Sequence, residues 1–465
     1  MSLRYAPYPA YRDSGHSTLG DVPKDWTVRQ LKRSVVDCAN GIWGADPTGG
    51  PEDIVVIRVA DFDRHKLGVL DGDYTRRRVT ERERQRRLLR QGDLLLEKSG
   101  GGEKTQVGQV VLFRAAIAAV CSNFVAKMSA NEGYASEYLN YSFSSLYAAG
   151  INSCSVKQNT GIQNLDSDAY LAEHWAFPPL SEQTQIAQFL NYETARIDVL
   201  IEKQQQLIEL LKEKRQAVIS HAVTKGLNSD APLRDSGIEW LGKVPAHWEE
   251  VPLKAILSLK HGYAFDGDAF AESGEFVLMT PGNFREEGGF RPKVPEKFYT
   301  RQDFPKEFVL ESGEMLVAMT EQGPGLLGCA ITVPNTGRYL HNQRLGLVRG
   351  LDRKRVDPRY LFHVFNSPRY RAAVSVGATG VKVRHTSPAR MLSVKVYLPP
   401  LVEQKQIAEF IDSRLATIES LHVKVNLTVE LLQERRTALI SAAVTGKIDV
   451  RNWRPPSSES EQAVS

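Results

Sequence analysis

Cysteine is scarce in this sequence, and long hydrophobic runs are missing. The four cysteines, Cys38, Cys121, Cys154 and Cys329, lie far apart and without the spacing of metal ligands. We therefore expect reduced thiols and neither a zinc site nor a disulfide framework. No stretch approaches the roughly 18 consecutive apolar residues of a membrane span, and the first residues lack the apolar core of a signal peptide. These absences predict a cytoplasmic protein without a membrane segment.

The usual sequence motifs of catalysis are missing as well. The adenine methyltransferase signature of Asn or Asp, Pro-Pro and an aromatic residue is absent, because the three Pro-Pro pairs are followed by Leu180, Leu401 and Ser457. No glycine-rich turn marks a dinucleotide or S-adenosylmethionine site, and the phosphate-loop lookalike at residues 101–105 lacks the glycine before Lys104. The histidines are scattered without ligand spacing. We therefore expect a chain that is not an enzyme and holds neither a cofactor nor a metal ion.

The overall composition is that of an ordinary globular protein. Of its 465 residues, 42% are hydrophobic and 25% charged, which suits two or three domains with hydrophobic cores. The net charge of +4, from 59 Lys and Arg against 55 Asp and Glu, is too small to indicate nucleic-acid binding by itself. Evidence for nucleic-acid binding must therefore come from how the charges are distributed along the chain.

One stretch of the sequence occurs twice. Residues 178–224 begin PPLSEQTQIAQFL and end KEKRQAVISHAVT, while residues 399–445 begin PPLVEQKQIAEFI and end QERRTALISAAVT. The offset between the copies is 221 residues (399 − 178), and nine of the first twelve positions are identical. A match at a fixed period sets the domain plan of the whole chain.

Each copy is predicted to be one long helix. Residues 181–224 and 402–445 contain no Pro and no Gly, and either stretch would make a helix about 66 Å long at about 1.5 Å per residue. Both stretches carry an apolar stripe at the three-and-four spacing of a coiled-coil seam. In the first copy the stripe is Leu190, Ile197, Leu200, Leu207, Leu211 and Val218, widened by Ile201 and Ile208; in the second it is Ile411, Ile418, Leu421, Leu432 and Leu439.

An apolar stripe of this length needs a partner, and the nearest equivalent stripe is the other copy. We expect the two helices to pair, in antiparallel orientation if the duplicated halves are related by a pseudo-two-fold axis. The alternative, that each helix packs on its own domain, stays open at the level of sequence.

A second repeat precedes each globular region. Arg12 to Gly15, then Leu19, Gly20, Val22, Pro23, Trp26 and Leu31, return 222 residues later within Arg234 to Leu253. In mid-chain this segment connects the first helix to the second globular region, so the second helix should end close to where the chain begins. The expected parts are a connector (1–30), a globular domain (31–177), a long helix (178–225), a connector (226–252), a globular domain (253–398), a long helix (399–450) and a disordered tail (451–465).

The two globular regions match each other only weakly. Their common anchors are apolar and strand-like: residues 54–57 against 276–279, Phe62 against Phe284, and residues 92–96 against 313–317. Together with helical stretches near residues 81–89 and 134–146, they predict mixed α/β domains. The same scaffold therefore carries two different surfaces.

Two windows are strongly basic. Residues 74–90 contain eight Arg against Glu81 and Glu83, and residues 338–390 contain twelve Lys or Arg against Asp352 and Asp357. Such patches suit phosphate groups, although solvated helix faces with internal ion pairs would look similar. Base reading needs polar side chains on loops that reach groove edges. Our candidates for DNA contact are Arg76, Arg77, Arg78, Lys98, Ser99, Lys104, Gln106, Asn123, Gln158, Asn159, Gln163 and Asn164 in the first domain, and Gln322, Asn342, Gln343, Arg344, Lys382, Arg384 and His385 in the second.

Taken together, these motifs resemble one known family. Two divergent domains alternate with helical segments that open with PPL..EQ..IA.F and are preceded by RDSG....LG.VP..W, which is similar to the specificity subunit of type I restriction-modification enzymes. The resemblance covers nearly the whole chain. It implies a mixed α/β fold with two target-recognition domains separated by two long antiparallel helices, which form an intramolecular coiled coil with a pseudo-two-fold internal repeat.

The resemblance also implies a function and partners. Each recognition domain would read one half of an asymmetric bipartite site on double-stranded DNA, and the helices would set the spacing. Two modification (methyltransferase) subunits would dock on the helices, bind S-adenosylmethionine and methylate adenine, and restriction subunits would join that complex. The family offers no catalytic residue to transfer to this chain.

Two other functions remain open from the sequence. A self-contained DNA methyltransferase or nuclease would need catalytic motifs that we do not find. A coiled-coil scaffold protein would not need two divergent basic domains. Assays of turnover and of binding to duplex DNA separate these possibilities.

Overall fold

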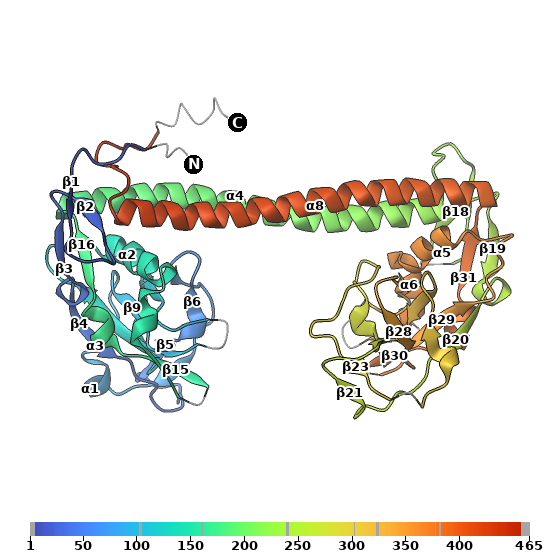
Figure 1. The fold of residues 1–465 in the computed structure, drawn as a ribbon, viewed down its shortest axis with the longest axis horizontal. Helices are drawn as coiled ribbons and strands as arrows, with labels where there is room; N and C mark the ends of the chain where they lie inside the picture. The colour runs from blue at the N-terminus through green and yellow to red at the C-terminus, as the bar shows by residue number, and fades with distance from the viewer. Residues whose placement is uncertain are drawn as a thin grey trace. The chain divides into compact units, whose positions relative to one another are not determined.

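The computed structural model describes residues 5–101, 105–159, 161–238, 241–301, 303–321, 325–376, 378–380 and 383–456, apart from the side chain of Asn159. The chain divides into two compact units: unit 1 is Met1–Lys203 with Thr428–Ser465, and unit 2 is Gln204–Leu427. Each unit contains one globular domain and one part of each long helix (Figure 1).

The elements of unit 1 alternate short strands with three helices. The strands are β1 (Tyr11–Asp13), β2 (Asp21–Pro23), β3 (Thr27–Gln30), β4 (Val35–Asn40), β5 (Asp53–Ile57), β6 (Phe62–Asp63), β7 (Gly68–Val69), β8 (Arg76–Arg78), β9 (Leu94–Glu97), β10 (Ser99–Gly100), β11 (Val110–Leu112), β12 (Ala119–Cys121), β13 (Val125–Ala130), β14 (Val156–Asn159), β15 (Ile162–Leu165) and β16 (His174–Phe177). The helices are α1 (Glu81–Arg84), α2 (Ser136–Ala148) and α3 (Ser167–Leu171).

Unit 2 follows the same plan. Its strands are β17 (Leu233–Asp235), β18 (Lys243–Pro245), β19 (Glu249–Pro252), β20 (Ser258–His261), β21 (Phe270–Ala271), β22 (Phe276–Met279), β23 (Phe298–Tyr299), β24 (Val309–Leu310), β25 (Met315–Ala318), β26 (Thr320–Glu321), β27 (Ala330–Thr332), β28 (Arg338–His341), β29 (Leu345–Arg349), β30 (Arg384–His385) and β31 (Lys395–Leu398). The helices are α5 (Pro358–Phe365), α6 (Pro368–Val376) and α7 (Pro388–Ser393), and the long helices are α4 (Leu180–Lys225) and α8 (Leu401–Val444).

The two domains share a sheet topology. An antiparallel sheet in the order β11-β9-β13-β4 in unit 1 has its counterpart in the order β27-β25-β29-β20 in unit 2. A parallel strand pair also recurs, β5 with β12 and β22 with β28. The apolar anchors predicted from the sequence form β5 and β22, and most of β9 and β25. The predicted mixed α/β fold is therefore confirmed.

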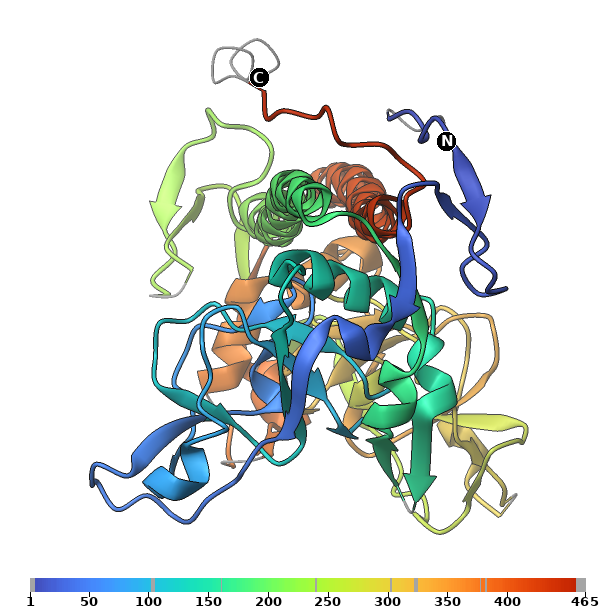
Figure 2. The same cartoon turned by 90° about the vertical axis from the view of Figure 1, so that its left-hand side faces the viewer.

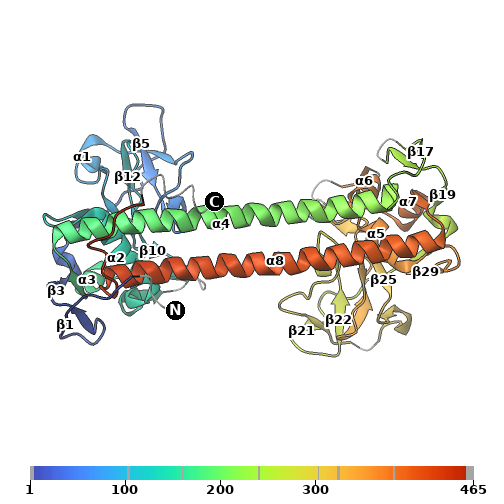
Figure 3. The same cartoon turned by 90° about the horizontal axis from the view of Figure 1, so that it is seen from above.

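The long helices pack against each other within each unit. In unit 1 the start of α4 shares a core with the end of α8, which includes Phe189, Leu190 and Ile440. In unit 2 the end of α4 shares a core with the start of α8, which includes Ile219 and Ile407. The helices are antiparallel in both units, as Figure 3 lets the reader follow. Helix α2 lies against the pair in unit 1 (Figure 2), and its Tyr141 Oη donates to Asn191 of α4 at 2.8 Å.

The predicted seam between the helices was partly wrong. Leu200, Leu207 and Leu421 were assigned to it, yet their side chains are 46%, 39% and 44% exposed. The buried and half-buried positions follow a heptad that also includes polar residues. In α4 it is Leu190, Thr194, Ile197, Ile201, Gln204, Ile208, Leu211, Arg215, Val218 and Ala222, and in α8 it is Ile411, Leu415, Ile418, His422, Val425, Val429, Leu432, Arg436, Leu439 and Ala443.

Two further expectations need correction. The helix expected near residues 81–89 ends at Arg84, although its Thr80–Glu83 capping box is present. The tail expected to be disordered from residue 451 begins with packed residues, because the Trp453 ring lies 5.4 Å from that of Phe189. Residues 457–465 lie outside the described part of the chain.

The ends of the chain meet as the repeated connectors predict. The amide of Asp449, just after α8, donates to the carbonyl of Ala6 at 2.8 Å, and Tyr11 Oη donates to the carbonyl of Gly446 at 2.9 Å. Both connectors fold alike, since Arg12 donates to the carbonyl of Trp26 at 2.6 Å and Arg234 to that of Trp248 at 2.7 Å. The segment that follows α8 therefore contacts the first connector, at the beginning of the chain.

Candidate nucleic-acid interface

Two short antiparallel ribbons bring many of the candidate residues together. In unit 1, β10 pairs with β15 in a register that sets Ser99 opposite Asn164 and Gly100 opposite Gln163. In unit 2, β26 pairs with β30 and sets Thr320 opposite His385 and Glu321 opposite Arg384. Every partner is displaced by 221 residues from its counterpart, so the two ribbons have the same register.

The outward positions of the ribbon in unit 1 form a row across three strands. Directly opposed residues share a face of the sheet, and Asn164 is opposite both Ser99 and Lys157 of β14. Asn164 and Lys157 are exposed and Ser99 is half-buried. Ser99 Oγ donates to Asn164 Oδ1 at 2.6 Å. The side chain of Lys157 lies 2.8 Å from Asp166.

The corresponding row of unit 2 carries other side chains. His385 is exposed and lies opposite Thr320, and a bridge connects it to Thr379 on its other side. Thr320 Oγ1 lies 3.2 Å from His385 Nδ1, so Thr320 positions the ring much as Ser99 positions the amide of Asn164. The backbone frames agree while the exposed chemistry differs.

The alternate positions of each ribbon point inward and anchor it. Gln163 is buried and accepts a hydrogen bond from the amide of Val107 at 3.2 Å. Arg384 donates to buried Glu321 at 3.1 Å and to the carbonyl of Ser375 at 2.6 Å. The geometry therefore gives Gln163 and Arg384 structural contacts, whatever else they bind.

A buried carboxylate supports the strand next to the ribbon in unit 1. Glu97, the last residue of β9, is fully buried and accepts hydrogen bonds from Arg64 at 2.8 Å. Burial raises the pKa of Glu97, and the Arg64 guanidinium opposes that rise without overcoming it. The corresponding residue in unit 2 is Ala318, and there Glu321 supplies the buried carboxylate instead.

A connecting loop between two sheets lies beside each ribbon. Between β12 and β13, the carbonyl of Phe124 accepts hydrogen bonds from the amides of Lys98 and Ser99, at 2.8 and 3.2 Å. Between β28 and β29, the carbonyl of Arg344 accepts one from the amide of Met319 at 3.0 Å. The connecting loops thus add exposed Asn123 to the ribbon of unit 1, and exposed Gln343 and Arg344 to that of unit 2.

Other candidates have partners in their own domain. Lys98 Nζ donates to Asn40 at 2.8 Å. The side chain of Gln106 accepts from Ser153 at 2.8 Å, and half-buried Asn342 accepts from the amide of Arg344 at 2.8 Å. Gln158 is exposed on β14. The side chains of Lys104, Asn159, Gln322 and Lys382 lie outside the described part of the chain, so their predicted contacts with DNA stay predictions.

Some arginines of residues 76–90 in unit 1 contact their own domain, and others are exposed to solvent. Arg77 is half-buried, pairs with Asp46 and lies 4.9 Å over the ring of Trp43. Arg76 donates to the carbonyl of Asp53 at 2.9 Å, although it is exposed, as is Arg78. A set of further exposed arginines follows: Arg82, Arg86 and Arg90. Guanidinium groups so placed suit a phosphate backbone.

Our sequence analysis missed three residues of these surfaces. Lys157 and Thr379 complete the two outward rows, and Phe124, which is 47% exposed, lies in the connecting loop beside the ribbon of unit 1. Lys157 and Thr379 lie only seven and six positions from Asn164 and His385, but the sequence does not show that these short segments pair as strands. The four residues of β14 are too few for an alternating strand pattern to be recognised.

Charged contacts connect each domain to the helices of its unit. In unit 1, Asp198 of α4 lies 2.9 Å from Arg436 of α8 and 3.2 Å from His65 of the domain. Burial would raise the pKa of Asp198, but the hydrogen bond from His65 and the guanidinium of Arg436 outweigh it and lower that pKa. In unit 2, Glu419 lies 3.9 Å from Arg215 and 4.0 Å from Arg285.

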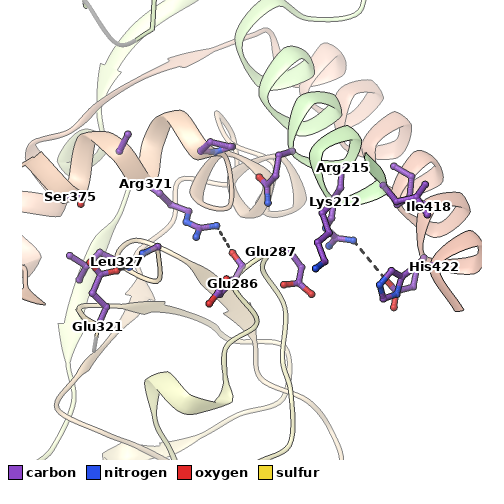
Figure 4. Close-up of a pocket in the computed structure, with 16 residues that line it drawn as sticks. Lys212, Arg215, Glu286, Glu287, Glu321, Leu327, Arg371, Ser375, Ile418 and His422 are labelled. Carbon is purple, nitrogen blue, oxygen red and sulfur yellow. Dashed lines mark hydrogen bonds and ion pairs between the residues drawn. The ribbon is translucent and has the colours of Figure 1, made fainter. Parts of the chain in front are cut away.

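A cavity of about 510 Å3 lies beside this junction in unit 2. Figure 4 shows Lys212, Arg215 and His422 of the helices facing Glu286, Glu287 and Arg371 of the domain. Charges of both signs line it, and Arg371 is bonded to the carbonyl of Glu286. The cavity therefore belongs to the junction between helix pair and domain, away from the ribbon's outward row.

Across the described ranges, no group of three or more His, Cys, Asp or Glu side chains is placed to hold a metal ion. In the same part of the chain, no helix has both the length and the apolar character needed to cross a membrane. The exposed polar rows make the ribbons and their neighbouring connecting loops the strongest candidate interface.

Comparison with known proteins agrees with this architecture. Residues 245–431 match the family model described as the type I restriction modification DNA specificity domain. The MjaVIII specificity subunit of Methanocaldococcus jannaschii is 25% identical over 437 residues, which cover 86% of this chain and 94% of that protein. The EcoBI specificity subunit of Escherichia coli is 24% identical over 221 residues, 46% of this chain and 42% of that protein.

Solved structures share the fold at low sequence identity. A chain from a study of complex assembly and conformational transition of the type I R-M system is 15% identical, with a TM-score of 0.68. The match covers 92% of this chain and 99% of that chain. The HsdS subunit from Thermoanaerobacter tengcongensis, also 15% identical, has a TM-score of 0.51 and covers 92% of this chain and 98% of its own.

The duplicated fold with two long antiparallel helices is that of restriction-modification specificity subunits. Residues 245–431 thus match the type I restriction modification DNA specificity domain, and the chain as a whole is similar to specificity subunits of type I restriction enzymes.

Proposed function

We propose that this chain is the DNA-recognition subunit, itself non-catalytic, of a multisubunit adenine methyltransferase and endonuclease. Each globular domain reads one half of a bipartite site on double-stranded DNA. The observation that carries this proposal is the pair of ribbons, which share a backbone register but expose Asn164 in one domain and His385 in the other. A frame kept constant under different side chains is what two different half-sites require.

The geometry suits the major groove of B-form DNA. A two-stranded β-ribbon fits that groove, where each base pair presents a distinct pattern of donors and acceptors. Hydroxyl, amide, imidazole and ammonium groups on the outward rows match those patterns. The exposed arginines of residues 76–90 supply phosphate contacts that hold the domain on the duplex without reading its sequence.

Exposed leucines on the long helices support docking of two modification subunits. Leu200 and Leu421 occupy equivalent repeat positions and are 46% and 44% exposed. Leu210 and Leu431 form a second equivalent pair, 59% and 54% exposed. Each unit therefore presents one leucine of each pair, and large apolar side chains in solvent on a helix suit a protein partner. Two equivalent surfaces favour two copies of one partner.

In this assembly the chemistry belongs to the partners. The modification subunits hold S-adenosylmethionine and methylate adenine, restriction subunits join them, and the long helices of this chain set the spacing between half-sites. Because the two outward rows carry different side chains, the two half-sites should differ in sequence.

A reconstitution experiment tests this function. The purified chain alone should neither methylate nor cleave duplex DNA, and S-adenosylmethionine-dependent adenine methylation should appear when the modification subunit is added. Turnover by the chain alone that persists through further purification would contradict the proposal. Replacing residues 31–177 with the same segment of a relative should alter one half of the methylated sequence, and a change in both halves would count against independent reading.

A further inference from the structure

The outward row of unit 1 has the donors and acceptors of an adenine reader. Asn164 is exposed at its centre, and its amide oxygen accepts a hydrogen bond from Ser99. That bond uses one lone pair of the oxygen. Among the described residues no partner takes the amide nitrogen, so a second lone pair and two N–H groups remain for a ligand.

Adenine is the base whose major-groove edge fits this arrangement. It presents the N7 acceptor beside the N6 amino donor, and an asparagine amide binds both at once. Guanine presents two acceptors there, of which an amide satisfies only one. Because Ser99 fixes the amide oxygen, it also decides which end of Asn164 faces N6, and so it acts as a positioning residue.

Unit 2 lacks this pairing at the same place. His385 Nδ1 lies against Thr320 Oγ1, which leaves the ring a single nitrogen, Nε2, for a base edge. One atom cannot bind two groups of a base in the way an amide does. The two ribbons therefore differ in the kind of contact they offer, although their registers agree.

We propose that Asn164, oriented by Ser99, specifies one adenine in the half-site read by unit 1, and that His385 at the equivalent position does not. This inference rests on the proposed function, since it assumes that the ribbons enter the major groove of DNA. It goes further by assigning a base to a residue.

The inference is tested by selecting bound duplexes from a library with randomised sequence. The full-length chain is used alone and with its modification subunit, and enriched sequences are counted. In the Asn164→Asp variant a carboxylate replaces the amide, so the N7 acceptor loses its donor and meets negative charge. Preference for adenine at one position should fall by about 5- to 150-fold, the range for one bidentate contact. Cytosine, which offers an N4 donor, should gain there.

Two further variants sharpen this experiment. Asn228→Asp adds the same charge on an exposed turn of the connector in unit 2, where Asn228 Oδ1 accepts from the amide of Asp230, and it should leave both half-sites unchanged. The double variant Thr320→Ser, His385→Asn rebuilds the Ser99–Asn164 pair in unit 2. It should introduce a preference for adenine in the other half-site.

The outcomes separate this inference from the function on which it rests. If the wild type enriches no sequence in either form, the proposed function fails. If it enriches a bipartite site whose adenines all survive Asn164→Asp, only the assignment of Asn164 is overturned. An unchanged second half-site in the Asn164→Asp variant shows that the protein is folded, so a loss confined to the first half-site supports the proposal.

Discussion

The indole nitrogen of Trp26 donates a hydrogen bond of 2.9 Å to a carboxylate oxygen of Glu182. Trp26 belongs to the repeated connector and Glu182 to the repeated start of a long helix. The second copies make the same bond, from Trp248 to Glu403 at 3.1 Å. The two motifs that occur twice in the sequence thus bind each other in both units.

Removing Glu182 should destabilise unit 1 strongly. Tyr8 Oη donates to the same buried oxygen at 2.6 Å, and burial together with Glu182 raises the pKa of Tyr8 so that it stays a donor. Glu182→Ala leaves two buried donors without an acceptor, which costs about 2–4 kcal/mol of unfolding free energy. Glu182→Gln keeps the acceptor oxygen and should cost less than about half as much. Urea unfolding measures both, and equal losses would argue against the hydrogen bonds.

The Asp198 ion pair should make stability depend on pH. Its folded-state pKa lies below the ordinary value of 3.8. A depressed carboxyl pKa stabilises the fold above the unfolded value, and this contribution disappears as pH falls through the folded value. At neutral pH, Asp198→Asn should therefore lose about 1–3 kcal/mol, as for a hydrogen bond to a charged group. The difference from wild type should shrink below about pH 4.

Thermal unfolding of both proteins between neutral and acid pH checks this prediction. Lys212→Ala, which removes an exposed charge from the same helix, serves as the control. A difference between wild type and Asp198→Asn that stays constant to the lowest pH would exclude the ion pair as its source.

Acidic substitutions of the exposed leucines should lower the number of bound partners. Leu200→Glu with Leu431→Glu alters the helix surface of unit 1 only, so one modification subunit should remain bound where two bind the wild type. Leu210→Glu with Leu421→Glu should have the same effect through unit 2. Native mass spectrometry gives the stoichiometry. Val376→Glu, at an 88% exposed position of α6, is the matched control, and full occupancy in both leucine pairs would contradict this docking surface.

Lengthening both helices by one heptad should lengthen the spacer between half-sites. Seven residues inserted after Leu207 and after Thr428 keep the seam in phase and add about 10 Å to each helix. At about 3.4 Å per base pair, the preferred spacer should grow by about three base pairs while the half-sites stay the same. Selection from duplexes with varied spacers measures this. A four-residue insertion puts the seam out of phase and should abolish binding. An unchanged spacer in the heptad variant would show that the helices do not set the spacing between half-sites.

The sequence predicted the parts of the fold that local patterns determine. The long helices follow from residues without Pro or Gly, and the connectors follow from a repeat of identical residues. The seam was misassigned because five of its positions carry Thr194, Gln204, Arg215, His422 and Arg436, which no search for apolar residues selects. Leu200 and Leu421 imitate seam positions by their spacing, yet they face solvent.

The candidate interface was less predictable for a different reason. The strands of its ribbons are two to four residues long and pair over 65 positions, as Ser99 does with Asn164, so neither periodicity nor proximity in sequence indicates them. The number of arginines in a window also does not show which of them contact other residues of the same domain. Arg77 is held by Asp46 and Trp43, whereas Arg78 is exposed. Which of the candidates touch DNA stays a prediction.

The arginines within the helix seam limit how the helices can be aligned. A purely apolar seam would tolerate sliding by one heptad, but Arg436 would then lie opposite Asn191 or Gln205 (198 ± 7) instead of Asp198. A largely buried guanidinium without a carboxylate is costly, so each alignment is either correct or strongly disfavoured. The helix pair can consequently become longer or shorter only by whole heptads that are gained or lost in both helices. Intermediate lengths would break the charged contacts of the seam.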